Sequence, residues 1–303
     1  MSSPLPDRLA TTGAITDLSD SVRLRFTGKD RLRYLNGQLT CDVRKASPDT
    51  VLHGCVTNHK GRLEAVVSLH SSGDTICLDA AASLADFLPA RLGKYIIADD
   101  VELEDISTAT ALLHFCGGNS DSFRSHLGEG ETAVAHARFG PPGIDIWCPP
   151  GRAAFWLSLA PALSQEEANA LRIRHGLPDW DADLSDGILP PEAGLDSTHI
   201  DYHKGCYIGQ EVLSRMRTAG KLNQRLVPIR LRGPAVAPGT PLLRSAPDGS
   251  TAPAGKVSSL CPDPDDPDGA WLGLAWLRKD SGEGPWICPQ EGQSPPTTSV
   301  TAR

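Results

Sequence analysis

The densest group of residues that could carry chemistry is the octapeptide KGCYIGQE, which occupies residues 204–211. Glycines stand on both sides of Cys206, and such residues allow a tight turn and a close approach of the backbone to a ligand. A helical run begins at Gln210, so the thiol is expected shortly before a helix N-terminus, with the cation of Lys204 nearby. Both features favour the thiolate form of a cysteine. We therefore predict that Cys206 is a reactive thiol; a small buried cysteine in a turn is the alternative.

Outside the octapeptide, the composition is that of a globular protein. The 303 residues are 40% hydrophobic and 22% charged, which is enough for one large or two ordinary domains with cores of their own. The net charge of −8 disfavours general binding to nucleic acid or to anionic membranes. Any such contact would have to be local.

Cysteine usage and the N-terminal residues indicate the compartment. The eight cysteines are scattered, without a CxxC pair, so reduced and mostly buried thiols are expected rather than disulfides. Residues 1–26 have neither an apolar stretch nor an Arg-rich amphipathic face, and no run reaches the length of a membrane span. We predict a cytoplasmic protein without a membrane segment.

The first half of the chain alternates between strand and helix patterns. Residues 21–26 alternate polar and apolar, which is typical of a half-buried strand. A helix is expected after Asp30, in the position of an N-cap, and should end at Asn36-Gly37. Residues 65–70 and 75–80, separated by a Ser-Ser-Gly-Asp turn, predict a hairpin.

Further helices and strands follow. Apolar residues at helical spacing predict an amphipathic helix over 83–96. Strand patterns return near residues 101–103 and 112–115. Ser164 and Glu167 form the pattern of a capping box, which predicts a helix running to His175.

The character of the sequence changes after about residue 225. Short strand patterns at 227–231, 240–244, 255–260 and 271–277 alternate with turns rich in Pro, Gly and Asp. They predict a small, separate β-barrel. Residues 285–303 are rich in Gly, Pro, Ser and Thr, so a flexible tail is expected there.

Two groups of residues have the composition of metal ligands. His199, His203 and Cys206 are spaced four and three apart, as on one face of a helix, but Gly205 interrupts that helix. Four aspartates within 263–268 could suggest calcium, but interspersed prolines break the pattern of an EF-hand loop. We expect hydrogen-bonded histidines and a solvated turn instead, and no metal.

A basic run lies between Val212 and Arg232 and contains no acidic residue. Such a run can hold a polyanionic ligand or RNA, although an ordinary solvated surface is the more frequent explanation. Its cations are Arg215, Arg217, Lys221, Arg225, Arg230 and Arg232.

The octapeptide resembles the signature of the YgfZ-type folate-binding proteins, a family that includes related mitochondrial iron-sulfur assembly factors. The likeness extends to residues 26–43, which are similar to the family's N-terminal pattern, and to the turn at 58–62. Residues 171–178 and 190–195 resemble the approach to the signature. In all, the resemblance covers about residues 20–280.

That family is similar to the T-protein of the glycine cleavage system, an aminomethyltransferase that uses tetrahydrofolate. The resemblance implies an α+β fold, with a ring of ferredoxin-like and related subdomains around a folate pocket, followed by a small C-terminal β-barrel. The implied domains are residues 1–224 for the folate-binding part and 225–284 for the barrel, with 285–303 as the tail. The implied contacts to tetrahydrofolate or a derivative come from Lys204, Gly205, Tyr207, Gly209, Gln210, Glu211, Arg215, Asn36 and Gln38.

The sequence departs from the transferases at two places. A turn like that at Gly61 leads, in the transferases, into an aspartate pair with the catalytic carboxylate, whereas Ala65 and Val66 stand here. Glu64 is the nearest carboxylate, and regular strand alternation would point it to the same side as Val66. The transferases also bind the pterin through a Glu in a Gly-rich hairpin; the similar stretch here, 139–147, has Pro141 at that place.

An intact signature beside a degraded catalytic carboxylate predicts a folate-binding accessory protein rather than an enzyme. Its implied partners are folate and iron-sulfur client enzymes, including those that modify tRNA, while direct binding of nucleic acid is not expected. Two alternatives stay open. One is a tetrahydrofolate-dependent one-carbon transferase or demethylase that uses Glu64, and the other is an RNA-binding module that uses the basic run.

Overall fold

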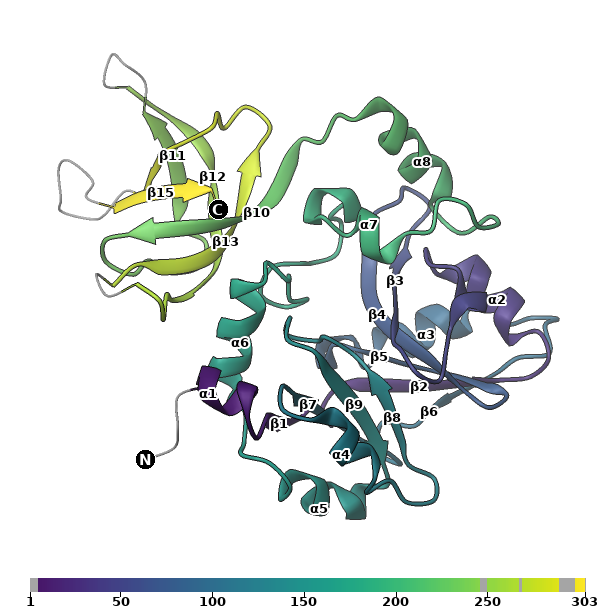
Figure 1. Ribbon diagram of the computed structural model, residues 1–303. Coiled ribbons are helices and arrows are strands. Elements are labelled where there is room, and N and C mark those ends of the chain that lie inside the picture. The colour runs from purple at the N-terminus through teal and green to yellow at the C-terminus, as the bar shows by residue number, and fades with distance from the viewer. Residues whose placement is uncertain (1–4, 246–249, 267–268, 289–297, 303) are drawn as a thin grey trace.

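A computed structural model describes residues 5–245, 250–266, 269–288 and 298–302. These residues form two antiparallel sheets with helices packed on them, and a closed barrel that stands to one side of both sheets (Figure 1). The expectation of an α+β fold with a C-terminal β-barrel is confirmed.

The larger sheet has five strands, in the order β3-β4-β5-β2-β6. Helices α2 and α3 cover one face, where Leu35, Leu88 and Leu92 meet Ala65 and Val67 of the sheet. The expected hairpin is confirmed as β4 and β5, which pair in antiparallel register. The elements of this part are β2 (Val22–Thr27), α2 (Arg31–Gln38), η1 (Val43–Lys45), β3 (Leu52–Thr57), β4 (Leu63–Ser72), β5 (Thr75–Ala80), η2 (Ala82–Leu84), α3 (Phe87–Gly93) and β6 (Glu102–Asp105).

The second sheet has four strands, in the order β1-β7-β9-β8. Its core stacks Phe115 of β7 on Phe123 of α4, and Trp156 of α5 is completely buried beside them. Its elements are β1 (Ala14–Asp17), β7 (Ala111–Cys116), α4 (Ser120–Arg124), β8 (Thr132–Ala135), β9 (Gly143–Cys148), η3 (Pro150–Arg152) and α5 (Ala153–Leu157).

Helix α6 (Gln165–Arg174) connects the sheets to the barrel. The capping box predicted at its N-terminus is confirmed, since the side chains of Ser164 and Glu167 each bond the other's backbone. At its other end, Ile173 packs against Cys261 and Leu272 of the barrel. The remaining helical elements are α1 (Leu5–Ala10), η4 (Pro190–Ala193), α7 (Asp196–His199) and α8 (Gln210–Ala219).

The barrel closes in the order β10-β13-β12-β11-β14-β15. Its interior is apolar and includes Ile229, Val257, Ala275, Trp286 and Val300. Its strands are β10 (Gln224–Arg232), β11 (Pro241–Ser245), β12 (Thr251–Pro262), β13 (Trp271–Arg278), β14 (Trp286–Cys288) and β15 (Thr298–Ala302).

The expected tail at 285–303 contains two strands of this barrel. Strand β14 pairs with β11, and β15 pairs with both β14 and β10. The polar composition was misleading because alternate residues point inward: Trp286, Cys288 and Val300 are buried. The described part of this segment is therefore structural, and residues 289–297 and 303 lie outside the described residues.

Two helix boundaries differ from expectation. Helix α2 continues through Asn36-Gly37 to Gln38, and Asp30 makes no side-chain cap, because its carboxylate accepts a hydrogen bond from the backbone of Asp100. The helix expected over 83–96 is reduced to α3, and Ile97, shortly beyond it, is 88% exposed. Apolar spacing alone therefore overestimated the length of α3.

Among the described residues, no helix has the length and apolar character required to cross a membrane.

Candidate functional site

The octapeptide 204–211 forms a loop that leads into α8, and Lys204 anchors this loop. Its ammonium group donates to the carbonyl oxygens of Asn36 (2.7 Å), Leu39 (2.7 Å) and Cys41 (2.5 Å), at the C-terminal end of α2 and just beyond. Burial lowers the pKa of Lys204 to about 8. The hydrogen bonds of Lys204 thus hold the loop on α2, whereas the sequence had suggested that its charge acts on Cys206.

Backbone contacts fix the loop on two more segments. The amide of Ile208 donates to the carbonyl of Gly37 (3.2 Å), and the hydroxyl of Thr57 donates to the carbonyl of Ile208 (2.6 Å). Just before the loop, the amide of Asp201 donates to the carbonyl of Thr40 (3.0 Å). The signature is therefore held between α2 and the end of β3.

Of the two glycines that flank Cys206 in the signature, Gly205 and Gly209, only Gly209 has to be glycine in the local geometry. Gly209 has φ = +88°, and a Cβ there would lie 2.6 Å from the carbonyl oxygen of Asn58 and 2.9 Å from Cα of Gly61. A Cβ at Gly205 would meet nothing within 4 Å. Gly209 is therefore the residue that lets α8 start against the β3–β4 turn.

Cys206 differs from the other cysteines in its exposure. All eight are free thiols, as expected, and the other seven are buried. Burial raises the pKa of Cys41 to about 12 and that of Cys116 to about 11. The thiol of Cys206 alone among them is open to solvent and to reagents.

The neighbours of Cys206 in the signature have different surroundings. Tyr207 is 7% exposed, and its hydroxyl is buried without a hydrogen-bond partner among the described residues. Gln210 and Glu211 begin α8 as expected. Glu211 and Arg215 form an exposed ion pair of 2.6 Å one helical turn apart, so the charge of Arg215 faces solvent.

Asn36 and Gln38 lie under the loop. The side-chain oxygen of Asn36 accepts from the amide of Val43 (3.1 Å). That of Gln38 accepts from Arg91 of α3 (3.0 Å), which also donates to Glu64 (2.7 Å) and to the carbonyl of Thr57 (3.1 Å). Arg91 therefore links α2, β3 and β4 beneath the signature.

A β-bulge decides where Glu64 points. Val56 pairs with Ala65 and Thr57 pairs with Leu63, so Glu64 is the additional residue on β4. The bulge turns Glu64 toward Arg91 on the helix-covered side of the sheet, while Val66 packs against the cluster around Leu184 and Trp276. The regular alternation expected for Glu64 and Val66 is broken here.

A cavity of about 490 Å³ adjoins the segment that precedes the signature. It is lined by residues 196–203 and, from the segment around η1 and β3, by Cys41, Asp42, Lys45 and Leu52. Arg217 of α8 lines it as well and stacks its guanidinium on the ring of Tyr202, 4.4 Å from the ring centre. None of the nine residues predicted to contact the cofactor lines this cavity, although all of them are described.

Behind the cavity, imidazole rings form a row that sequence reasoning missed. The ring of His199, which lines the cavity, lies 5.1 Å from that of His53, and His53 lies 5.0 Å from His136. Burial, reinforced by neighbouring imidazoles, lowers the pKa of His53 to about 3 and that of His199 to about 4. Both rings are therefore neutral at pH 7.

The row ends at a buried charge cluster around Asp145 of β9. Nδ1 of His136 and Nδ1 of His114 lie 2.7 and 2.8 Å from its two oxygens. Arg138 donates to Asp145 and also to Asp79 of β5 (2.9 Å). Although burial alone would raise it, the charge of Arg138 holds the pKa of Asp145 well below its ordinary value. A carboxylate inside the apolar strand 143–148 was the only sequence signal for this cluster.

The described residues contain no group of three or more His, Cys, Asp or Glu side chains arranged to hold a metal ion. Asp263 and Asp266, considered above for calcium, bind Arg230 instead.

Comparison with known proteins gives relatives of several kinds, although no family model matches the chain. The tRNA-modifying protein YgfZ of Vibrio vulnificus is 31% identical over 245 residues, which are 75% of this chain and 72% of that protein. A chloroplastic putative transferase of Arabidopsis thaliana is 27% identical, over 73% of this chain and 57% of that protein. A mitochondrial iron-sulfur cluster assembly factor homologue of Mycosarcoma maydis is 25% identical, over 75% and 60%.

A solved structure matches almost the whole chain. The glycine cleavage system aminomethyltransferase T of Bartonella henselae superposes with a TM-score of 0.82 over 98% of this chain and 87% of that one. The sequence identity is 16%, so the match establishes the fold.

Proposed function

The chain belongs to the YgfZ family, and on that basis we propose that it is a folate-binding accessory protein that supports the assembly or repair of iron-sulfur enzymes, including enzymes that modify tRNA. Its partners are then those client enzymes, and its place is the cytoplasm. A relative named as an iron-sulfur cluster assembly factor supports the client class.

One observation carries the proposal. The signature is intact, and three hydrogen bonds from Lys204 hold it in place while the thiol of Cys206 stays exposed. An exposed thiol on an anchored loop can meet a partner protein without a change of fold. We assign Cys206 the role of the functional thiol.

The cofactor of this proposal is tetrahydrofolate or a derivative. The cavity of about 490 Å³ is within the usual range of small-molecule sites, about 300–1,000 Å³. Arg217 stacks on Tyr202 and has no ion pair within the described ranges, so its charge is available to a ligand carboxylate. Of the nine residues implied as contacts, Lys204, Gly209, Asn36 and Gln38 then act around the cavity, by holding the loop and the start of α8 in position, rather than inside it.

The first experiment replaces the thiol. Cys206→Ala should lower the activity of iron-sulfur enzymes in cells that depend on this protein, while its thermal unfolding stays unchanged because the side chain is exposed. Cys77→Ala, which removes a buried thiol elsewhere, is the matched control and should retain function once folded. Unchanged enzyme activity with Cys206→Ala would remove the thiol from the mechanism.

The second experiment tests the cofactor. Tetrahydrofolate at a hundred times Kd should stabilise the native state by about 2.7 kcal/mol, which a thermal shift detects. Arg217→Met should weaken binding about tenfold or more, since it removes a charged hydrogen-bond donor. Arg215→Met, on the same helix but paired with Glu211 at the surface, is the control; equal losses in both variants would place folate elsewhere.

A tetrahydrofolate-dependent one-carbon transferase or demethylase is the second candidate, favoured by the fold match. Ala65 and Val66 cannot exchange a proton, and Glu64 is engaged by Arg91. Formation of methylene-tetrahydrofolate from a donor amine, abolished by Glu64→Gln, would establish this candidate instead.

The basic run between Val212 and Arg232 is poorly suited to binding RNA. Arg230 and Arg232 bind Asp266, and Arg215 binds Glu211. The run is also divided between α8 and β10, so its charges do not form one continuous stripe along an element.

A further inference from the structure

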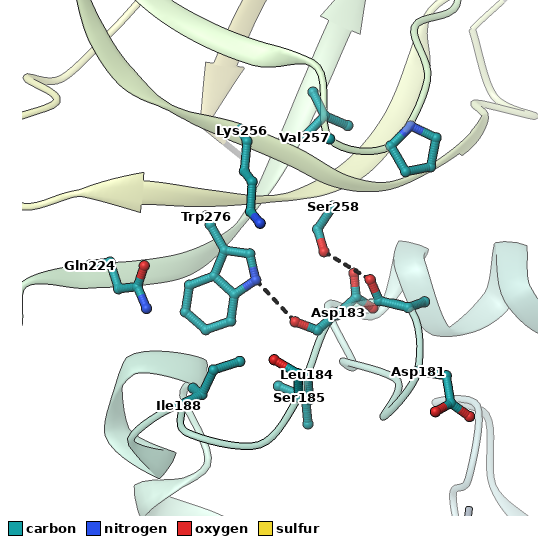
Figure 2. Close-up of a pocket in the computed structure, with 13 residues that line it drawn as sticks. Asp181, Asp183, Leu184, Ser185, Ile188, Gln224, Lys256, Val257, Ser258 and Trp276 are labelled. Atoms are coloured by element: carbon teal, nitrogen blue, oxygen red, sulfur yellow. Dashed lines mark hydrogen bonds between the residues drawn. The ribbon is translucent and has the colours of Figure 1, made fainter. Parts of the chain in front are cut away.

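A second cavity, of about 410 Å³, lies between the barrel and the segment that follows α6 (Figure 2). Residues 181–185 and Ile188 form its lower side in that view, and strands β10, β12 and β13 form the upper side. It shares no lining residue with the cavity beside the signature.

The walls of this cavity are fixed to each other by buried polar contacts. The indole nitrogen of Trp276 donates to the carbonyl of Asp183 (3.0 Å), and the hydroxyl of Ser258 donates to that of Ala182 (3.2 Å). The carboxylate of Asp183 is completely buried; it pairs with Arg172 and accepts a hydrogen bond from Ser259. Because these contacts cross from the barrel to the segment, the cavity is preformed.

Lys256 supplies a charge that no other described residue compensates. Its ammonium points into the cavity between Trp276 and Ser258 (Figure 2) and takes part in no ion pair or hydrogen bond among the described residues. The acidic groups nearby are occupied: Asp183 by Arg172, and Asp181 by the hydroxyl of Ser83 (2.6 Å). Figure 2 places Asp181 at the far edge of the cavity from Lys256.

The rest of the lining is suited to a short apolar group. The ring of Trp276 lies beside Leu184 and Ile188, and these side chains form one apolar surface. Gln224 donates its amide N–H to Glu192 (3.3 Å), which leaves its carbonyl oxygen as an acceptor at the rim. One cation next to a small apolar wall is the pattern that recognises an amphipathic anion.

We propose that this cavity binds a small carboxylate with an apolar body, with the carboxylate on Lys256 and the apolar part on Trp276. The site is separate from the signature and does not depend on the proposed folate function. A carboxylate is favoured because one ammonium can neutralise a single negative charge, and the residues that line the cavity include no second cation to balance a more highly charged anion.

The test uses isovalerate as the probe and its neutral amide, isovaleramide, as the comparison. The indole N–H resonance of Trp276, assigned with Trp276→Phe, is followed by NMR during titration of the full chain. Isovalerate should shift this resonance saturably, and isovaleramide should bind at least about tenfold more weakly, because it lacks the charge.

Variants then separate charge from fold. Lys256→Met should weaken isovalerate binding about tenfold or more, Lys256→Arg should restore most of it, and Lys94→Met, at an exposed lysine at the end of α3, should not alter it. The proposal is overturned if the amide binds as well as the acid or if Lys256→Met binds normally. It is equally overturned if isovalerate shifts the indole resonance of Trp276 only at concentrations that shift all the other indole resonances as well.

Discussion

Asp145 holds the two sheets together through one buried charge. It lies on β9 of the four-stranded sheet, and Arg138 links it to Asp79 on β5 of the five-stranded sheet. His114 and His136 complete its hydrogen bonds. Removing one member of such a cluster leaves the other charge uncompensated in a dry environment, which costs far more than losing a surface ion pair.

Asp145→Asn should therefore lower the free energy of unfolding by about 3–5 kcal/mol, measured by urea denaturation. Asp280→Asn is the control, because Asp280 pairs with Arg278 at the surface and both are largely exposed; its effect should stay below about 1 kcal/mol. Similar losses in the two variants would show that the buried cluster contributes no more than a surface pair.

The imidazole row makes stability depend on pH. The pKa of His53 falls from 6.5 to about 3 in the folded protein, and that of His199 to about 4. Well above pH 6.5 both rings are neutral in either state. As the pH falls below 6.5, the unfolded chain binds protons that the folded protein does not, so stability declines. The groups around His53 are His136, His199, Arg138 and Asp145.

Urea denaturation at pH 7, 6 and 5 measures this decline. His53→Gln should flatten it, because the variant has one group fewer to protonate on unfolding. The loss between pH 7 and pH 5 should be about 2 kcal/mol per histidine, because pH 5 lies about 1.5 units below the unfolded pKa and one pKa unit corresponds to about 1.4 kcal/mol. An identical slope in His53→Gln would contradict the lowered pKa.

For single residues, the sequence predicts a property when neighbouring residues in the chain determine it, and fails when tertiary packing determines it. The reduced cysteines and the distinct position of Cys206 follow from spacing and flanking residues, and the free thiols are confirmed. His53, His136 and His199 are far apart in the chain and meet only where the two sheets and α7 pack together. No pattern within one segment can indicate such a contact.

At the scale of elements, the contact between α8 and the β3–β4 turn depends on Gly209. Gly209→Ala should lower the free energy of unfolding by at least about 2 kcal/mol, because positive φ costs about 1–2 kcal/mol and the new Cβ would lie 2.6 Å from the carbonyl of Asn58.

Gly205→Ala is the matched control within the same loop. No atom lies within 4 Å of its Cβ position, so stability should change by less than about 0.5 kcal/mol. If both variants behave alike, the close approach at Gly209 does not hold the loop.

Elements with strong local signals could be predicted, and those set by tertiary contacts could not. The capping box at Ser164 and the hairpin around Ser71–Asp74 are determined by neighbouring residues, and both are confirmed. The continuation of α2 through Gly37 depends on contacts from the signature loop, which bonds the carbonyls of Asn36 and Gly37. The bulge at Glu64 likewise has no sequence pattern of its own.

At the scale of the whole molecule, β15 closes the barrel, although the polar composition of residues 285–303 did not predict a strand there. A chain ending at Gly284 lacks β14 and β15, which leaves β10 and β11 with open edges and removes Trp286 and Val300 from the core. We expect this truncated chain to lose the barrel's cooperative unfolding while the two sheets stay folded. Amide hydrogen exchange distinguishes the parts, and full protection of β10–β13 would contradict the prediction.

The same closure has a consequence during synthesis. Strand β10 ends at Arg232, but its partner β15 begins only at Thr298, so a ribosome needs several seconds to make the residues between them. For that interval the edge of β10 that β15 will occupy is open to chaperones and to pairing with other chains. Nascent chains arrested before Thr298 should therefore be cleaved by protease in the barrel segment and resist it in the two sheets.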